Sequence, residues 1–159
     1  MKLYWLGHGS FRLEAAGQVI LIDPWINGNP MLPEDQVAPA IDGATHILVT
    51  HGHFDHTNDI VEISKRSEAP VSGMYELAAA LHGQGAVEGH AFNKGGSIGI
   101  GDVSAAMVPA SHSSAMAVDG VARYMGSEIG YMISAEGKTV YVSGDTDIMA
   151  DMDWMADFY

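Results

Sequence analysis

The run His51-Gly52-His53-Phe54-Asp55-His56 places three imidazoles and a carboxylate within one short turn. It directly follows the apolar stretch Ile47-Leu48-Val49-Thr50, which has the composition of a buried strand. Side chains two residues apart in an extended segment point the same way, so His51 and His53 can hold one ion at the end of that strand. Gly52 relieves crowding where the chain must curl to bring the last two residues of the run to the same pocket. The spacing therefore predicts a metal site.

The donor atoms of this run indicate which ions it would bind. Neutral imidazole nitrogens and carboxylate oxygens together suit Zn(II), and they also accept Mn(II) or Fe(II). The chain has no cysteine, which excludes thiolate sites. A solvated histidine-rich loop is the alternative interpretation. The internal position of the run after a predicted strand, and the aspartate within it, argue for the metal site.

Two residues further along the chain occupy positions suited to the same centre. His112 follows the apolar run Val103–Pro109, and Asp145 follows the run Thr139–Ser143. Each lies in a polar turn just beyond a predicted strand. Taken alone, the histidine could be a hydrogen-bonded surface residue, and the aspartate could cap a helix within Ser-Gly-Asp-Thr. Their shared placement after a strand makes both candidates for metal ligands.

Composition limits the classes of protein that fit the chain. Its 159 residues are 47% hydrophobic, which is enough for one domain with a buried core. Seven Lys and Arg stand against 20 Asp and Glu, for a formal charge of −13. Such a surface repels phosphate backbones, so we expect no nucleic-acid partner. No segment is long and apolar enough to span a membrane and the start of the chain has no signal-like pattern, so we expect a cytoplasmic protein without a membrane partner.

The first half of the chain reads as short strands followed by alternating helices and strands. Brief apolar or alternating runs separated by glycine turns predict an antiparallel meander, and a strand then delivers the histidine run. The expected strands are Lys2–Leu6, Phe11–Ala15, Val19–Ile22, His46–Val49 and Val71-Ser72. We expect helices over Asn58–Ser67, capped by Thr57 or Asn58, and over Met74–Leu81. The strand-helix-strand crossover indicates an α/β layer arrangement.

The second half predicts another sheet and a closing helix. The expected strands are Ile98–Ile100, Val103–Pro109, Gly130–Ser134 and Thr139–Val142. A helix over Ile148–Phe158 would place Ile148, Met152, Met155 and Tyr159 on one apolar face. The longest segment without periodicity is Asn27–Pro39, which we expect to be a loop.

The order of these motifs resembles the metallo-β-lactamase fold superfamily. The resemblance rests on His51-x-His53-x-Asp55-His56, followed by His112 and by Asp145 after a Val-Ser-Gly run. The motifs Trp5-Leu6-Gly7-His8-Gly9-Ser10-Phe11, Leu21-Ile22-Asp23-Pro24-Trp25 and His112-Ser113-Ser114 resemble uncharacterised metal-dependent hydrolases grouped with ascorbate-6-phosphate lactonase. The resemblance covers essentially the whole chain. It implies an α/β fold, an αββα sandwich with metals between the edges of two sheets.

The resemblance also implies a role for each candidate residue. One ion would be held by His51, His53 and His112, the second by Asp55 and His56, and both would be bridged by Asp145. Paired ions about 3.5–4 Å apart share a hydroxide and polarise a carbonyl or phosphoryl oxygen. Asp55 is the expected catalytic residue, because it could take up the proton that the hydroxide releases. We expect His8 to contact substrate or to orient a ligand, and Asp23 to be a turn residue or the hydrogen-bond partner of a ligand histidine.

One departure from the superfamily pattern concerns the second ion. Its site usually receives a further histidine from a strand near the C-terminus, whereas this chain has no histidine after His112. We therefore expect a single metallo-β-lactamase-like domain over residues 1–159 that lacks its C-terminal strand-helix-strand portion. A complementary C-terminal chain or a homo-oligomer would supply the ligand, or the second site would be weak or absent.

The expected function is a metal-dependent hydrolase that uses a metal-bound hydroxide on a small ester, lactone or phosphoester. One alternative is a mononuclear iron dioxygenase of the same fold. Di-iron oxidoreductases of the superfamily carry Glu where His53 stands, which argues against that branch. The non-enzymatic alternative is a metal-binding subunit or fragment that is inactive without a complementary C-terminal chain. No motif indicates the substrate within the hydrolase class.

Overall fold

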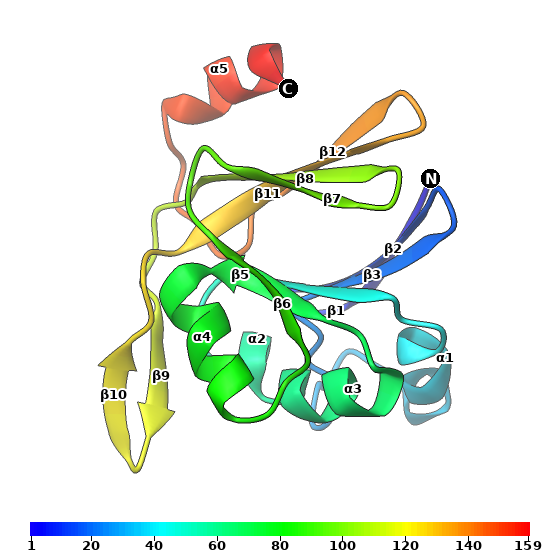
Figure 1. Ribbon diagram of the computed structural model, residues 1–159, viewed down its shortest axis with the longest axis vertical. Coiled ribbons are helices and arrows are strands. Elements are labelled where there is room, and N and C mark those ends of the chain that lie inside the picture. The colour runs from blue at the N-terminus through cyan, green and yellow to red at the C-terminus, as the bar shows by residue number, and fades with distance from the viewer.

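Two β-sheets packed face to face form the centre of the computed structural model, which describes residues 1–159 (Figure 1). Helices lie on the outer side of each sheet, so the layers run helix, sheet, sheet, helix. The helices are α1 (Val37–Ile41), α2 (Phe54–Thr57), α3 (Ile60–Ser67), α4 (Tyr75–Gly83) and α5 (Asp151–Phe158), with a 3₁₀ turn η1 (Glu34–Gln36). This arrangement confirms the predicted αββα sandwich. None of these helices is long and apolar enough to cross a membrane.

The first sheet combines a meander with parallel strands. Its order follows the chain, β1-β2-β3-β4-β5-β6. The strands are β1 (Lys2–Gly7), β2 (Ser10–Ala15), β3 (Gln18–Ile22), β4 (His46–Val49), β5 (Val71–Met74) and β6 (Glu88–Phe92). The pairs β1–β2 and β2–β3 are antiparallel, whereas β3–β4, β4–β5 and β5–β6 are parallel. Parallel neighbours need crossovers, which α1, α3 and α4 provide on one face of the sheet.

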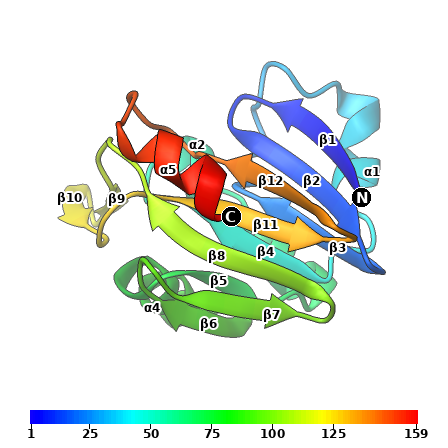
Figure 2. The ribbon, with the colours of Figure 1, turned by 90° about the horizontal axis from the view of Figure 1, so that it is seen from above.

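The second sheet is antiparallel throughout, with the order β12-β11-β8-β7. Its strands are β7 (Ser97–Ile100), β8 (Val103–Pro109), β11 (Ile129–Ala135) and β12 (Lys138–Val142). A small hairpin of β9 (Ala115–Val118) and β10 (Val121–Tyr124) stands at the margin of the molecule between β8 and β11 (Figures 1 and 2).

Alternation along β8 shows how the sandwich is built. Ala105 and Met107 belong to the large core cluster of 32 buried residues that the two sheets share with α1, α3 and α4. Their neighbours Ala106 and Val108 face outward and pack with Met155 of α5. Successive side chains on a strand point to opposite faces, so one strand serves both interfaces. Figure 2 shows α5 lying across the outer face of this sheet.

Several predicted boundaries differ from the structure. The helix expected from Asn58 begins at Ile60, and its N-cap residue Asp59 makes no side-chain capping bond. The last helix begins only at Asp151, and Ile148 is 86% exposed, so its place on the apolar face was wrong. The segment before this helix is tied to the loop after β8, because Asp147 donates its backbone N–H to Ser111 O at 2.9 Å.

Some elements were not predicted. The loop expected over Asn27–Pro39 contains η1 and the start of α1. The strands β6, β9 and β10 lacked a pattern that marks a strand. Every residue of β10 is exposed, and β6 has no fully buried residue, so neither segment shows the alternation of a half-buried strand.

Candidate metal site

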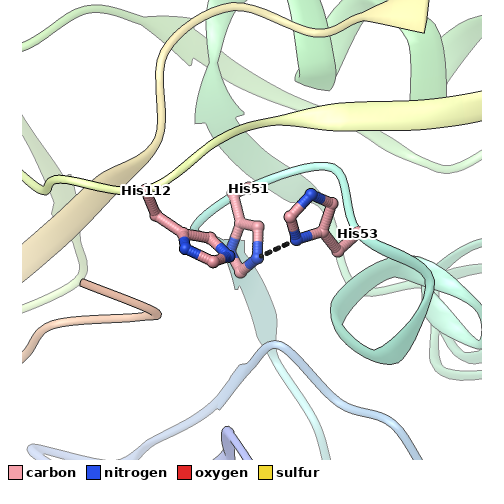
Figure 3. A group of neighbouring side chains, drawn as sticks. All are labelled: His51, His53 and His112. Atoms are coloured by element: carbon pink, nitrogen blue, oxygen red, sulfur yellow. Dashed lines mark hydrogen bonds between the residues drawn. The ribbon is translucent and has the colours of Figure 1, made fainter. Parts of the chain in front are cut away.

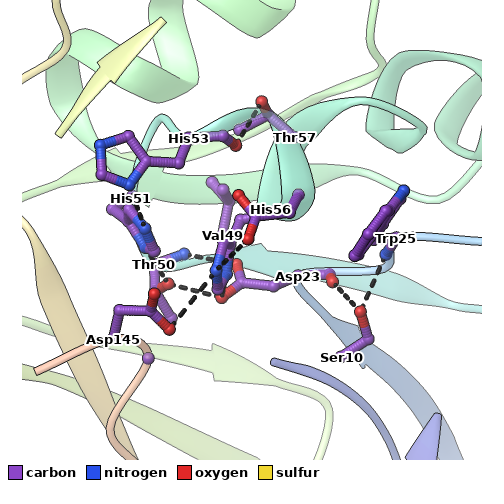
Figure 4. Close-up of polar contacts among 12 residues, drawn as sticks. Ser10, Asp23, Trp25, Val49, Thr50, His51, His53, His56, Thr57 and Asp145 are labelled. Atoms are coloured by element: carbon purple, nitrogen blue, oxygen red, sulfur yellow. Dashed lines mark hydrogen bonds and ion pairs between the residues drawn. The ribbon is translucent and has the colours of Figure 1, made fainter. Parts of the chain in front are cut away.

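Five segments meet where the two sheets open at one edge, and they carry all the predicted site residues. His8 lies in the turn between β1 and β2, and Asp23 directly follows β3. The run 51–56 follows β4 and forms the start of α2. The second sheet contributes His112 after β8 and Asp145 after β12. Residues separated by up to 137 positions thus come together. Figure 4 shows Asp23, Asp145 and the histidines of the run 51–56 side by side.

Three histidines form the first cluster (Figure 3). His51, His53 and His112 each offer a ring nitrogen, and these atoms lie within 4.8 Å of one another. The ring centroids are 4.7 to 5.2 Å apart and the rings stand almost perpendicular, so three ring edges converge instead of stacking. His51 Nε2 lies 3.1 Å from His53 Nδ1. Zn–N bonds are about 2.0–2.1 Å long, and this spacing suits three nitrogens around one ion.

The second cluster contains His8, Asp55 and His56, whose donor atoms also lie within 4.8 Å of one another. His8 Nε2 is 2.6 Å from Asp55 Oδ2. His56 Nε2 is 3.8 Å from the same oxygen. Asp145 lies between the clusters, with Oδ1 3.4 Å from His56 Nε2 and Oδ2 3.7 Å from His112 Nε2.

Asp23 sets the orientation of two of these histidines from behind (Figure 4). Its Oδ2 lies 2.8 Å from His56 Nδ1 and also accepts the Thr50 hydroxyl proton. Because that hydroxyl donates to Asp23, its lone pair accepts from His51 Nδ1, 3.0 Å away. Both rings therefore carry the proton on Nδ1 and turn the Nε2 lone pair toward the pocket. Such partners fix the tautomer of a metal-ligating histidine.

His56 Nε2 provides a direct test of whether these residues fit a metal. It is buried and has no hydrogen-bond partner. An unpaired buried polar atom costs about 1–3 kcal/mol, which a bound cation would remove. The donor set of imidazoles and carboxylates is also the one that Zn(II), Mn(II) and Fe(II) accept. The residues present therefore fit a divalent metal.

The electrostatics of the site differ between its histidines. Burial, and secondarily the neighbouring His56, lower the pKa of His51 to about 4, so this imidazole is neutral at pH 7 and free to bind an ion. Burial would also lower the pKa of His56, but Asp23, Asp145 and Asp55 outweigh it and raise that pKa. The carboxylates thus favour positive charge at this point of the pocket. Burial would raise the pKa of Asp55, but the combined effect of His56, a backbone N–H and His8 lowers it.

Two glycines allow the close packing of the site. A Cβ on Gly9 would lie 2.6 Å from His56 Cε1, so only glycine lets the β1–β2 turn approach that ring. A Cβ on Gly52 would lie 3.1 Å from the backbone carbon of Ala115. The crowding that Gly52 relieves therefore comes from the β9 segment as well as from the curl of its own chain.

Several residues support the site although the sequence assigned them no role. The Thr50 hydroxyl links Asp23 to His51, and Ser113 Oγ lies 3.3 Å from His53 Nε2. Glu128 Oε1 accepts the backbone N–H of His112 at 3.3 Å. Trp25 packs edge-on against His8 and Phe54, at ring distances of 5.3 and 5.7 Å. The supporting role of each residue follows only from the contacts that it makes in the fold.

The remaining histidines lie outside the clusters. His46 Nε2 lies 2.8 Å from Ser72 Oγ inside the first sheet. His82 Nε2 lies 2.9 Å from the carbonyl oxygen of Val71. His90 is exposed on β6. These residues had no motif support, and none of them belongs to the three groups with metal-ligand spacing.

Known proteins share both the sequence and the architecture. Residues 18–158 match the family model described as Beta-lactamase superfamily domain. A UPF0173 metal-dependent hydrolase of Ruegeria sp. (strain TM1040) is 55% identical over 159 residues, which are 100% of this chain and 69% of that protein. A UPF0173 metal-dependent hydrolase of Dinoroseobacter shibae is 56% identical over 152 residues, covering 96% of this chain and 66% of the relative.

Solved structures agree with this match. Igni18, a metallo hydrolase from the archaeon Ignicoccus hospitalis, superposes with a TM-score of 0.82 at 30% identity, covering 99% of this chain and 66% of that one. A possible metal-dependent hydrolase from Veillonella parvula gives a TM-score of 0.72 at 21% identity over 96% of this chain and 66% of its own, a similarity of fold. The chain thus spans about two thirds of the length of these relatives.

Proposed function

The chain belongs to the metallo-β-lactamase superfamily, and from this premise we propose that it is a metal-dependent hydrolase of a small ester, lactone or phosphoester. Relatives that are more than half identical to it are named metal-dependent hydrolases. The observation that carries the proposal is the convergence of two donor clusters, joined by Asp145, at the open edge between the sheets. We also propose that residues 1–159 act as one domain, since a single core cluster includes residues of both sheets.

We assign the residues to two ions. His51, His53 and His112 would hold one ion, Asp55 and His56 would hold the second, and Asp145 would bridge them. Zn(II) is the first choice, with Mn(II) and Fe(II) as alternatives. Bound in this way, the ions would supply an activated water at neutral pH and polarise a carbonyl or phosphoryl oxygen.

The chain's own residues would orient the ligands and move the proton. Asp23 and Thr50 hold the Nδ1 protons of His56 and His51, which keeps both Nε2 atoms available as ligands. Asp55 is the group placed to accept a proton from the attacking water, because its carboxylate is partly exposed at the mouth of the pocket. Burial lowers the pKa of His51 to about 4, so this imidazole is neutral and available as a ligand at pH 7.

Two aromatic side chains lie beside the candidate ligands. Phe54 is 69% exposed between the ligands His53 and Asp55, and its ring packs edge-on against Trp25. An exposed aromatic surface beside a polar centre suits the non-reacting part of a substrate. We therefore propose an organic ester, lactone or phosphoester with an apolar portion.

The test is a substrate screen on the metal-loaded protein. The chain is loaded with Zn(II) or Mn(II) and assayed against lactones, carboxylic esters and phosphodiesters. His53→Ala should lower the rate by more than about 100-fold, because loss of a mere partner of a ligand already costs about 10–100-fold. His90→Ala, on exposed β6, is the matched control and should keep the wild-type rate.

Other outcomes would replace the proposal. No turnover of any substrate class by the loaded protein, or a rate indifferent to His53→Ala, would sink the hydrolase function. Bound iron with oxygen uptake would indicate the dioxygenase. Turnover that appears only after a complementary C-terminal chain is added, or only in a homo-oligomer, would indicate a metal-binding subunit.

A further inference from the structure

The turn between β1 and β2 places His8 against Asp55. His8 Nε2 lies 2.6 Å from Asp55 Oδ2, although 47 residues separate the two in sequence. The donor atoms of His8, Asp55 and His56 lie within 4.8 Å of one another. This proximity is therefore a product of the fold and not of spacing within the histidine run.

His56 directs an unsatisfied ring nitrogen toward the same position. Its Nδ1 is engaged by Asp23 at 2.8 Å, whereas the buried Nε2 has no hydrogen-bond partner. Around this Nε2 lie two carboxylates, Asp55 Oδ2 at 3.8 Å and Asp145 Oδ1 at 3.4 Å. A lone pair facing two anionic oxygens is stabilised by a cation between them.

From this geometry we propose that His8 Nε2 is a direct ligand of the second ion, together with Asp55, His56 and Asp145. The inference rests on the proposed function, which places an ion on the last three residues. Two imidazoles and two carboxylates make a tetrahedral set for Zn(II), whose ligand bonds of about 2.0–2.2 Å place donor atoms about 3.4 Å apart. The observed separations of 2.6, 3.4 and 3.8 Å bracket that value.

Ligation would change the partner of His8 Nε2. In the structure, His8 Nε2–H donates a hydrogen bond to Asp55 Oδ2. Ligation would require the Nε2 proton to move to Nδ1, so that Nε2 offers its lone pair to the ion while Asp55 Oδ2 binds the same ion. One polar contact is thereby replaced by two bonds to a cation.

The turn holds the His8 ring in place before any ion binds. The His8 backbone has φ +52°, in the left-handed region, and its carbonyl oxygen accepts a 2.8 Å bond from Trp5 Nε1. Trp25 packs edge-on against the His8 ring. Gly9 leaves room for His56, because a Cβ there would lie 2.6 Å from His56 Cε1. A ligand ordered in advance loses little conformational entropy on binding.

Nuclear magnetic resonance of the cadmium-113 form tests the contact directly on the wild-type chain. With nitrogen-15 in the histidines, a ligating ring nitrogen shows scalar coupling to the metal. We expect couplings from His8, His51, His53, His56 and His112, with the His8 signal assigned by its loss in His8→Gln. Absence of coupling at His8 in a chain that binds two ions would overturn the proposal, as would binding of only one ion.

Metal titration gives a second readout that does not depend on activity. His8→Ala should keep the first ion within about 3-fold of its wild-type Kd and weaken the second by at least about 100-fold, more than loss of a hydrogen-bond partner alone would cause. His90→Ala should bind both ions as the wild type does. Unchanged binding of two ions by His8→Ala would refute direct ligation. Weaker binding of the second ion in His8→Ala, together with no turnover by the metal-loaded wild type, would support this inference while refuting the hydrolase function.

Discussion

Every hydrogen bond at the Asp23 side chain is one that the carboxylate accepts. The donors are the Thr50 N–H at 2.7 Å, the Thr50 hydroxyl and His56 Nδ1 at 2.8 Å. Asp23 is fully buried, so water cannot replace any of these partners. A single buried carboxylate therefore determines which nitrogen of His56 is free to bind an ion, and through Thr50 it influences His51 as well.

Replacing Asp23 by Asn should impair metal binding more than folding. The Asn amide N–H₂ must face one of three donors, or His56 must move its proton to Nε2 and lose its ligand lone pair. Asn tolerates the left-handed backbone of this residue, φ +46°, so the turn itself should persist. We expect the Kd of the second Zn(II) ion, the one that His56 would bind, to rise by about 10–100-fold in calorimetric titration.

A charge-matched control separates this effect from simple loss of an acid. Asp102→Asn removes one carboxylate from the exposed turn between β7 and β8 and should leave the Kd unchanged. Equal weakening by both substitutions would show that net charge, and not the orientation of His56, governs affinity.

His46 predicts a pH dependence of stability that is independent of the metal site. Burial, with a smaller contribution from His90, lowers its pKa from 6.5 to about 4. Because the folded pKa is the lower one, the unfolded chain takes up the proton first as pH falls. The contribution of neutral His46 to the free energy of unfolding is therefore complete above pH 6.5 and is lost as the pH falls from 6.5 to 4. It amounts to about 3 kcal/mol at most.

Urea unfolding of the chelator-treated protein at pH 7, 5.5 and 4.5 measures this dependence. His46→Gln can still bond to Ser72, and its free energy of unfolding should fall less steeply with pH than that of the wild type. His90→Gln should retain most of the wild-type slope, since burial is the larger cause. Parallel slopes for the wild type and His46→Gln would refute the assignment.

At the scale of elements, the β1–β2 turn is the part of the fold most sensitive to added volume near the site. Gly9→Ala would put a Cβ 2.6 Å from His56 Cε1, and the turn or the ring must shift. We expect the second ion to bind more weakly by about 10-fold or more, as judged by chelator competition, because misplaced ligands forfeit metal affinity. Gly99→Ala in β7 meets nothing within 4 Å and is the control. Equal affinity for Gly9→Ala and the wild type would show that the turn yields freely.

The sequence predicted the elements whose burial alternates or is complete. His46–Val49 and Val103–Pro109 agree with β4 and β8 because apolar side chains there fill the core. It failed where neighbours distant in sequence decide the structure. The exposed Ile148 lies outside α5, since a backbone bond to Ser111 keeps its segment from joining the helix.

In the candidate site, too, local patterns predicted some residues, whereas the roles of others depend on contacts across the fold. The run 51–56 was recognisable because its candidate ligands are adjacent, and His112 and Asp145 because each follows a strand. The hydroxyl of Thr50 and the packing of Trp25 against His8 depend on contacts across the fold, which no local pattern reports. The hydrogen bond between His8 and Asp55 likewise requires two segments that only the first sheet brings together.

At the scale of the whole molecule, the site joins the two sheets. The ligand candidates His51 and His53 follow β4 of the first sheet, whereas His112 and Asp145 follow β8 and β12 of the second. An ion bound by both groups is a cross-link at the open edge of the sandwich. It would also offset repulsion within a chain of net charge −13.

Metal binding should therefore raise the thermal stability of the chain. At free ion concentrations near 100 times Kd, each site contributes about 2.7 kcal/mol, which corresponds to a rise in Tm of about 5–10 °C for a domain of this size. Differential scanning calorimetry of the chelator-treated chain with and without Zn(II) measures the shift. His112→Ala should lose the part of the Tm shift due to the first ion, because it removes the ligand histidine that the second sheet supplies. His90→Ala, an equally small change on exposed β6, should keep the full shift. A Zn(II)-induced shift that is the same in both variants would mean that the ions bind elsewhere and do not join the sheets.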